Sequence, residues 1–554
     1  MDHDALRIIP LGGLGEIGKN MTAIEYRGKI VVVDCGIEFP RDEMLGIDLI
    51  LPDVSWLVER RDDVLGFVIT HGHEDHQGAL PFVLKQVNRP VYGSRFTLAL
   101  IKSKLDEHGL LRTTEVNEVS ETSRMDLGPF RLSFVAVSHS VPDALSVVLG
   151  TDMGHVVVTG DYKFDHTPID GRITDVNALA KLGQEGVLAL LADSTNAETP
   201  GSTASESVVG EAFHRIFAEA EGRVVLACFA SHIHRVQQAI RIAHLHGRKF
   251  AVSGRSMQKN VNIARNLGYL DVPEGSMIKL TEIDDYRPEE LLILSTGSQG
   301  EPLSALTRMA FDDHPQVALH EGDTVVISAN PIPGNEVSVM ATVNRLLKSG
   351  ATVIYGARSG VHVSGHAAQE DMRMMLKLLR PMYFVPMHGE YRHQYLHAEL
   401  AREAGLGDER IFILENGDVL EIDEEDAAVV DKVHTGMMYV DGFEIGDAEG
   451  LVVRDRQKLA GDGILIAVVT VDAQNGDSVA PPELVARGFL HDDDRLRDVL
   501  DECGEALEAL MVELGREHVT GKRLIREDIT QTLAELVYRR TKRRPLILPI
   551  VVEV

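Results

Sequence analysis

Three histidines and an aspartate fall within six residues of the sequence, in the stretch Thr70-His71-Gly72-His73-Glu74-Asp75-His76. Imidazole and carboxylate groups suit hard or borderline divalent cations. His71 and His73 lie two residues apart and can share one metal, while Asp75 and His76 can serve a second metal about 3.5–4 Å away, the spacing of binuclear hydrolytic sites. The alternative, a surface loop that is rich in histidine by chance, does not explain this combination and spacing.

The flanking residues indicate how the chain presents this cluster. Gly66-Phe67-Val68-Ile69 is an apolar, β-rich run that predicts a buried strand. Gly72 permits a sharp turn, and residues 78–84 predict the start of an amphipathic helix. The ligands therefore lie on a loop at the carboxyl end of a strand, the edge at which layered α/β folds bind ligands.

Other predicted strands also end at potential metal ligands. Residues 131–137 precede His139, residues 155–159 precede Asp161, and residues 383–387 precede His388. One such strand end means little, but four strand ends that deliver histidine or aspartate indicate a shared site.

The bulk composition limits the class of protein. At 554 residues the chain is too long for one core, so about three domains are expected. The formal charge of −30 argues against non-specific coating of nucleic acid, but leaves room for a nucleic-acid enzyme with its basic groups and metals in one groove. Three separate cysteines, Cys35, Cys228 and Cys503, indicate a reducing compartment and no thiolate metal site. Without a signal peptide or an apolar run of about 18 residues, we expect a soluble, cytoplasmic protein that does not enter a membrane.

The segment from Gly12 to Gly18 contains GxGxxG, and Asp34 follows at a distance that suits a dinucleotide fold. We favour another interpretation, because residues 21–26 predict a strand and Arg27-Gly28 a hairpin turn, which leaves no helix to bind a pyrophosphate. The acidic segment 38–53 is interpreted as a solvated cover over the sheet edge in preference to a metal site.

A second domain is predicted between Asp161 and His388. Residues 207–221 predict a helix, and the apolar runs 224–229, 249–252, 291–294 and 324–327 alternate with further helices. This alternation is typical of a parallel α/β domain. Small polar residues at the strand ends offer backbone N–H groups to phosphate, although turn and capping chemistry explains part of them.

The C-terminal stretch follows a predicted linker at residues 448–460. We expect strands at 463–469 and 546–552 and amphipathic helices at 494–514 and 527–538. This small α/β domain carries no catalytic constellation, so self-association is its expected role. A basic cluster (Arg539, Arg540, Lys542, Arg543 and Arg544) either contacts RNA or is a solvated face.

The ligand order, H-x-H-x-D-H followed by a later histidine, aspartate and histidine, resembles the metallo-β-lactamase superfamily, whose fold is an αββα sandwich. By position, the resemblance implies that His71, His73 and His139 hold one metal, that Asp75, His76 and His388 hold the other, and that Asp161 bridges them.

The insertion resembles that of the β-CASP nucleases. Five segments, 10–20, 229–231, 254–257, 295–302 and 386–390, look like bacterial ribonuclease J, and the resemblance covers nearly the whole chain. It implies a metallo-β-lactamase domain at residues 1–198 and 359–447, an inserted parallel α/β β-CASP domain at 199–358, and a C-terminal α/β association domain at 461–554.

The same resemblance implies hydrolysis of RNA phosphodiesters by two zinc ions per subunit, with Mn²⁺ or Mg²⁺ as a substitute or activator. His366 would protonate the leaving 3′ oxygen, and Asp193 would orient His366 or a metal-bound histidine. The implied phosphate and RNA-end pocket comprises Ser231, His232, Ile233, His362, Val363, Ser364, Gly365 and His366. The expected activity is 5′-to-3′ exonucleolytic with a preference for 5′-monophosphate ends, plus endonuclease cutting.

We expect single-stranded RNA as the substrate in RNA maturation and decay, including rRNA processing and mRNA decay. The expected assembly is a homodimer or dimer of dimers, with an RNA-degradation complex as a further partner. Three alternatives stay open: a β-CASP nuclease acting on DNA or tRNA 3′ ends, a hydrolase of small thioesters or lactams, and a non-catalytic RNA-degradation scaffold. The large insertion argues against the second and the complete ligand set against the third.

Overall fold

The computed structural model describes residues 5–40, 44, 46–301, 303–332, 334–442, 444–447, 451–474, 476–490, 492–519 and 521–554. The chain forms two compact units, one of Met1–Phe39 with Leu49–Met438 and one of Pro40–Asp48 with Tyr439–Val554. Within the described ranges, no helix combines the length and apolar character needed to cross a membrane. Pro302 of the family-like segment 295–302 lies outside the described residues.

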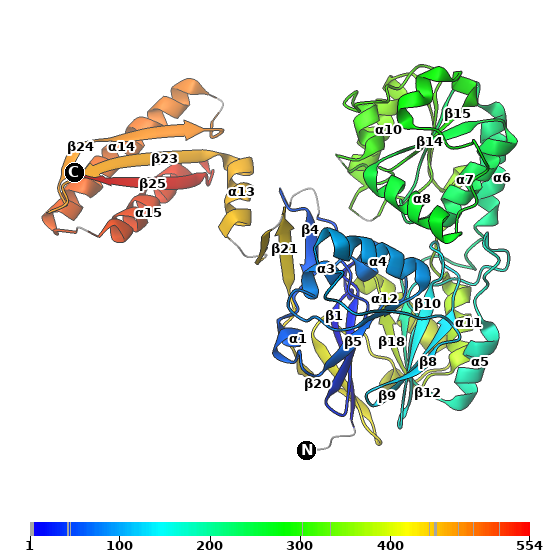
Figure 1. Ribbon diagram of the computed structural model, residues 1–554. Coiled ribbons are helices and arrows are strands. Elements are labelled where there is room, and N and C mark those ends of the chain that lie inside the picture. Colours follow the sequence, from blue (N-terminus) through cyan, green and yellow to red (C-terminus); the bar gives the residue numbers. More distant parts are fainter. Residues whose placement is uncertain are drawn as a thin grey trace. The chain divides into compact units, whose positions relative to one another are not determined.

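Two β-sheets packed face to face form the base of the first unit (Figure 1). The larger sheet runs in the order β20-β19-β1-β2-β3-β5-β6-β7 and the smaller in the order β18-β12-β11-β10-β9-β8. The strands are β1 (Leu6–Gly12), β2 (Met21–Tyr26), β3 (Lys29–Val33), β5 (Val64–Val68), β6 (Val91–Gly93), β7 (Val116–Glu118), β8 (Arg124–Leu127), β9 (Phe130–Ala136), β10 (Leu145–Thr151), β11 (Gly154–Val158), β12 (Val187–Asp193), β18 (Tyr383–Met387), β19 (Asp418–Ile422) and β20 (Ala427–Lys432). Side chains from both sheets, such as Ile24 and Val147, share one buried core.

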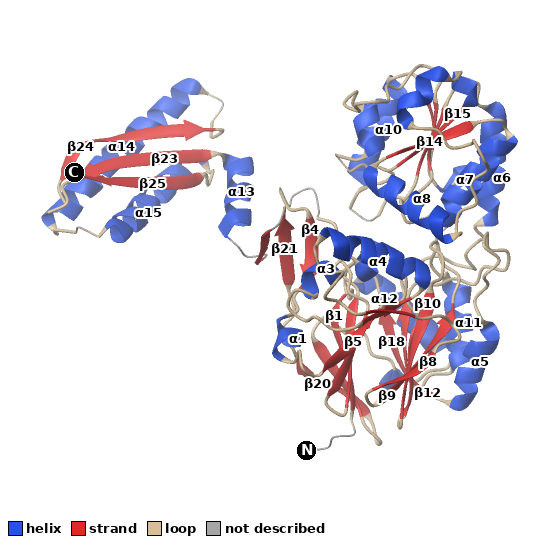
Figure 2. Ribbon diagram, in the orientation of Figure 1, coloured by secondary structure: helices blue, strands red, loops and turns tan. Residues whose placement is uncertain are grey.

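Helices cover the outer faces of the sandwich (Figure 2). They are α1 (Ser55–Glu59), α2 (Glu74–Gln77), α3 (Leu80–Val83), α4 (Arg95–Glu107), α5 (Val176–Glu185), α11 (Gln369–Leu379) and α12 (Tyr391–Glu403). A second core lies between the smaller sheet and α5, α11 and α12. The predicted αββα sandwich is therefore confirmed, and the predicted strand ends at His139, Asp161 and His388 follow β9, β11 and β18.

The amphipathic helix predicted from Gly78 is wrong. The chain instead makes the two single-turn helices α2 and α3, and every residue of α3 is buried. Because α3 packs beneath α4, this segment needs no polar face.

The inserted domain is a parallel sheet surrounded by helices (Figure 1). Its strand order is β14-β15-β13-β16-β17, and every pairing is parallel, which confirms the predicted architecture. The elements are α6 (Ser207–Glu219), β13 (Val224–Ala227), α7 (Ile233–Leu245), β14 (Lys249–Ser253), α8 (Arg255–Leu267), β15 (Leu291–Ser295), α9 (Ala305–Ala310), β16 (Thr324–Ile327), α10 (Glu336–Lys348) and β17 (Thr352–Ile354).

The second unit contains a sheet in the order β24-β23-β25, with β23 (Ile464–Val471), β24 (Ser478–Arg487) and β25 (Leu546–Glu553). The helices α14 (Asp493–Arg516) and α15 (Lys522–Thr541) pack on one face. Strand β24 was not predicted, because Pro481 and Pro482 interrupt its pattern; an edge strand tolerates prolines. Most of the predicted linker is helix α13 (Leu451–Asp462), and residues 448–450 lie outside the described ranges. Short strands β4 (Leu49–Pro52), β21 (Met437–Asp441) and β22 (Glu444–Asp447) complete the chain.

Candidate metal centre

Three histidines and an aspartate face one another at the carboxyl end of β5. Nδ1 of His73 lies 3.1 Å from Nε2 of His71 and 3.1 Å from Nε2 of His139. Oδ2 of Asp161 lies 3.4 Å from Nε2 of His71 and 3.5 Å from Nε2 of His139. His73 precedes α2, and His139 and Asp161 follow β9 and β11, so separate elements supply one group of ligand atoms.

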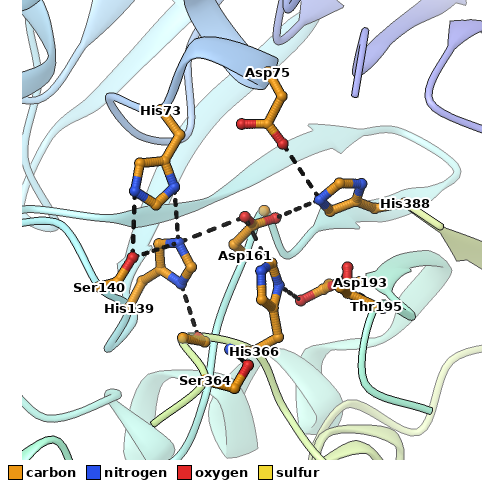
Figure 3. Close-up of polar contacts among 12 residues, drawn as sticks. His73, Asp75, His139, Ser140, Asp161, Asp193, Thr195, Ser364, His366 and His388 are labelled. Carbon is orange, nitrogen blue, oxygen red and sulfur yellow. Dashed lines mark hydrogen bonds and ion pairs between the residues drawn. The ribbon is translucent and has the colours of Figure 1, made fainter. Parts of the chain in front are cut away.

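A second group shares Asp161 with the first. Oδ1 of Asp161 lies 3.2 Å from Nε2 of His76 and 3.7 Å from Nε2 of His388. Oδ2 of Asp75 lies 3.5 Å and 3.6 Å from the same two nitrogens. His388 has a φ of 51°, a left-handed conformation that turns the chain sharply after β18. The sequence-predicted set of seven side chains is thus brought together, with Asp161 between its two halves. Figure 3 shows His73, Asp75, His139, Asp161 and His388 of this set.

The donor set fits divalent cations. Oδ1 of Asp161 is buried and has no hydrogen-bond partner among the described residues. Burial lowers the pKa of His71 and of His139 well below the usual value, so both rings keep a free lone pair at neutral pH. Burial alone would lower the pKa of His76 too, but the carboxylates of Asp161, Asp75 and Asp34 raise it well above the usual value. Imidazoles and buried carboxylates together are ligands for cations such as Zn²⁺ or Mn²⁺.

In three of these rings Nδ1, the nitrogen that faces away from the centre, has a hydrogen-bond partner. Nδ1 of His76 donates to Oδ2 of Asp34 at 2.8 Å, and Nδ1 of His139 lies 2.8 Å from the carbonyl oxygen of Gly365. Nδ1 of His71 lies 3.0 Å from the hydroxyl of Thr70, which itself lies 3.0 Å from Oδ2 of Asp34. Such partners fix the ring tautomer and turn Nε2 toward the centre.

Asp34 is the functional candidate that sequence reasoning missed. It is buried, it directly follows β3, and its φ of 62° places its carboxylate beneath the histidine loop. Its position at the end of a strand is the same signal that marks His139 and Asp161, but its spacing from the GxGxxG segment gives Asp34 a second explanation in the sequence.

The glycine-rich segment 12–18 is not followed by a helix but leads directly into β2, as predicted. Leu14 and Glu16 form bridge pairings with Gly389, next to His388, and Nδ2 of Asn20 donates to the carbonyl oxygen of Asp75. This loop therefore supports two of the ligand positions.

The interpretation of segment 38–53 as a solvated cover is wrong at Glu38. Glu38 is buried and pairs with the buried Lys19 at 3.3 Å, and Lys19 also pairs with Glu16 at 2.8 Å. Burial and the two ion pairs tie the start of this segment to the glycine-rich loop.

His366 and Asp193 lie beside the carboxylate of Asp161 that the two groups share (Figure 3). Nδ1 of His366 lies 2.8 Å from Oδ2 of Asp193 and 3.8 Å from Oδ2 of Asp161. Burial lowers the pKa of His366, but the carboxylates of Asp193 and Asp161 outweigh it and raise the value to about 9. Asp193 is held in turn by the backbone N–H and hydroxyl of Thr195, at 2.9 and 2.7 Å.

The residues of the predicted phosphate pocket come from two segments. His232 precedes α7 and is buried; the side chain of Ile233 is also fully buried. His362 to His366 form an irregular, partly buried segment. Within it, the hydroxyl of Ser364 accepts from Nδ2 of Asn196 at 2.8 Å.

The two-sheet sandwich, the shared-aspartate centre and the inserted parallel domain define the β-CASP class of metallo-β-lactamase-fold proteins. Family models match in the same order: metallo-beta-lactamase superfamily at residues 14–200, ribonuclease J beta-CASP domain at 221–346, Zn-dependent metallo-hydrolase RNA specificity domain at 352–414, and ribonuclease J C-terminal domain at 451–554.

Full-length relatives narrow this class. The chain is 44% identical over 545 residues to ribonuclease J 1 of Streptococcus pyogenes, covering 98% of this chain and 97% of the relative. It is 42% identical to ribonuclease J2 of Bacillus subtilis, covering 99% of both chains. The chain therefore belongs to the ribonuclease J family. A crystal structure of a protein of unknown function from Enterococcus faecalis shares the fold at a TM-score of 0.53 and 15% identity, over 76% of this chain and 100% of that chain.

Proposed function

We propose that this chain is a metal-dependent ribonuclease that hydrolyses RNA phosphodiesters as a 5′-to-3′ exonuclease. It prefers 5′-monophosphate ends and also cuts internally. The observation that carries the proposal is the pair of ligand groups joined at Asp161, with a His366–Asp193 pair directly beside them. The names of the relatives and of the matched RNA specificity domain support RNA as the substrate.

Two zinc ions per subunit are the proposed cofactors, with Mn²⁺ or Mg²⁺ as a substitute. His71, His73 and His139 would hold one ion, Asp75, His76 and His388 the other, and Asp161 would contact both. Bound divalent cations supply an ionised water at neutral pH and neutralise charge on the phosphoryl oxygens.

His366 supplies the proton for the leaving group in this proposal. The carboxylate of Asp193 raises the pKa of His366 and accepts from Nδ1–H, which leaves Nε2–H to donate. As the bond between phosphorus and the 3′ oxygen breaks, that oxygen takes the Nε2 proton. Asp193 then keeps the neutral ring in the orientation from which it can be protonated again.

We further propose that the protein acts on single-stranded RNA in the cytoplasm, in RNA maturation and decay. The C-terminal domain would join subunits into a homodimer. One experiment tests the activity: timed cleavage of one RNA labelled at either end and carrying a 5′ monophosphate, triphosphate or hydroxyl. We expect early release of mononucleotides from the monophosphate substrate; release of internal fragments alone would contradict the exonuclease assignment. A DNA strand of the same sequence should be cut far more slowly.

A further inference from the structure

Arg235 is the largest fully buried side chain in the described part of the molecule, with 0% of its surface exposed. It lies in the first turn of α7 and forms a bidentate ion pair with Glu206, at 2.5 Å from Nε to Oε1 and 2.8 Å from Nη2 to Oε2. Nε2 of Gln238 also donates to Oε1 of Glu206, at 3.0 Å. A buried pair of this kind adds little net stability, because desolvation offsets the attraction, so a role in positioning is the hypothesis that it supports.

The remaining guanidinium hydrogens hold one irregular segment in place. Nη1 donates to the carbonyl and hydroxyl oxygens of Ser328 at 2.8 and 2.9 Å and lies 3.2 Å from Nδ1 of His362. Nη2 lies 3.3 Å from the carbonyl oxygen of Val363. Residues 361–364 belong to no helix or strand, so no regular backbone ladder fixes their course. Arg235 instead joins this segment to the end of β16 and to α7.

Arg235 also determines the tautomer of His232, which precedes α7. The backbone N–H of Arg235 donates to Nδ1 of His232 at 3.4 Å, so the ring proton must reside on Nε2. That Nε2 is buried and has no hydrogen-bond partner among the described residues; Oε2 of Glu206 is 3.8 Å away. A buried donor without an acceptor is costly, and a ligand oxygen would satisfy it.

Both histidines are neutral. Burial, followed by the charge of Arg235, lowers the pKa of His232 well below its usual value and that of His362 to about 3. Glu206 already neutralises the guanidinium. The ligand that fits these two rings is therefore an oxyanion bound through neutral N–H donors.

We propose that Arg235, paired with Glu206, is a positioning residue for recognition of a 5′-terminal phosphate. It fixes segment 361–363 against the first turn of α7, so that Nε2–H of His232 and this segment meet the same phosphate, and it does not touch the phosphate itself. The inference rests on the proposed 5′-monophosphate preference and assigns part of that preference to a buried ion pair.

The test uses Arg235→Lys, which keeps the positive charge but cannot form the bidentate pair. It also uses Glu206→Gln, which keeps the shape of the side chain but removes its negative charge. Arg241→Lys, on an exposed position of α7, is the matched control. Calorimetry with adenosine 5′-monophosphate, and with adenosine as the phosphate-free probe, measures binding to the metal-loaded protein. Steady-state cleavage compares RNA carrying a 5′ monophosphate with the same RNA carrying a 5′ hydroxyl.

We expect Arg235→Lys and Glu206→Gln to weaken nucleotide binding and raise KM for 5′-monophosphate RNA by about 10- to 100-fold, with kcat within about threefold. Bound metal and the kinetics of 5′-hydroxyl RNA should stay close to wild type, as should every value for Arg241→Lys. If Arg235 had a merely structural role, kcat/KM would fall for both RNA substrates together, and that result would overturn the inference.

Two further outcomes separate the inference from the proposed function. If wild-type protein itself does not distinguish the two RNA ends, the proposed preference fails. If wild type distinguishes them and the variants do so equally well, the preference stands and the role of Arg235 is refuted. Should Arg235→Lys not fold, the ratio of the two KM values in Glu206→Gln decides, and an unchanged ratio refutes the role.

Discussion

Nδ1 of His366 lies 2.8 Å from Oδ2 of Asp193, on the side of the bridging carboxylate Asp161. His366 belongs to the segment that returns from the inserted domain, and Asp193 ends β12 of the sandwich. This hydrogen bond therefore ties the segment that returns from the inserted domain to strand β12 at the proposed reaction site. Substitution of either residue therefore tests what this hydrogen bond contributes.

Asp193→Asn should lower kcat by about 10²- to 10⁴-fold, the range for loss of general acid–base catalysis. The amide removes the negative charge that raises the pKa of His366 and can present its NH₂ group to Nδ1, which favours the wrong tautomer. Single-turnover cleavage measures the loss, while KM and bound metal should stay unchanged.

The control for this prediction is His366→Ala, which should lower kcat by about as much as Asp193→Asn. The double variant should lower kcat little further, since the two residues act as one unit. Elemental analysis of Asp193→Asn decides between the two roles considered for Asp193. Loss of metal would show that Asp193 orients a metal-bound histidine and would contradict its assignment as the partner of His366.

That the candidate ligands lie together could be predicted because each belongs to a pattern that is local in sequence: an apolar run followed by a histidine or aspartate. Asp34 obeys the same rule, yet its partner His76 lies 42 residues away, and only the folded sheet brings β3 beside β5. Arg235 could not be predicted, because a charge near a helix start reads as solvated; its burial depends on Glu206 and Ser328, which come from distant segments.

Asp34→Asn should weaken metal binding by about 10- to 100-fold, the usual effect of removing a carboxylate behind a ligating histidine. Asparagine tolerates the φ of 62° and can still accept from the backbone N–H of Thr70. Metal titration followed by cleavage assays should show activity returning at high metal concentration. Asp62→Asn, at an exposed position, serves as the control; unaltered metal affinity in Asp34→Asn would remove this residue from the centre.

His73→Ala should abolish cleavage and reduce bound metal, because Nδ1 of His73 lies between the other two imidazoles of its group. Cations that bind only the folded chain stabilise it, by about 2.7 kcal/mol at a hundredfold excess over Kd. A chelator should therefore lower the Tm of wild type but change that of His73→Ala much less, as measured by calorimetry. His214→Ala, an exposed histidine outside the centre, should behave as wild type. Full activity in His73→Ala would overturn the ligand assignment.

Association of subunits should depend on the open face of the C-terminal sheet. Buried residues of β23 such as Leu465 and Val469 point to α14 and α15, and their neighbours point to the other face. On that face Ile550, Leu548 and Val485 are 38%, 44% and 45% exposed. Exposed aliphatic side chains grouped on one face of a sheet are typical of a surface that binds a partner, and the proposed homodimer is tested at this face.

Ile550→Lys should raise the dissociation constant of the dimer by at least about a hundredfold, because the interface would then bury an unpaired charge. The side chain is already partly exposed, so the domain itself should fold normally. Sedimentation velocity across a concentration series measures the change. Val512→Lys, on the helical side of the same domain and 53% exposed, is the matched control and should leave the dimer intact. Dissociation caused by Val512→Lys but not by Ile550→Lys would place the contact on the helices, because a lysine is unfavourable only where the partner excludes water.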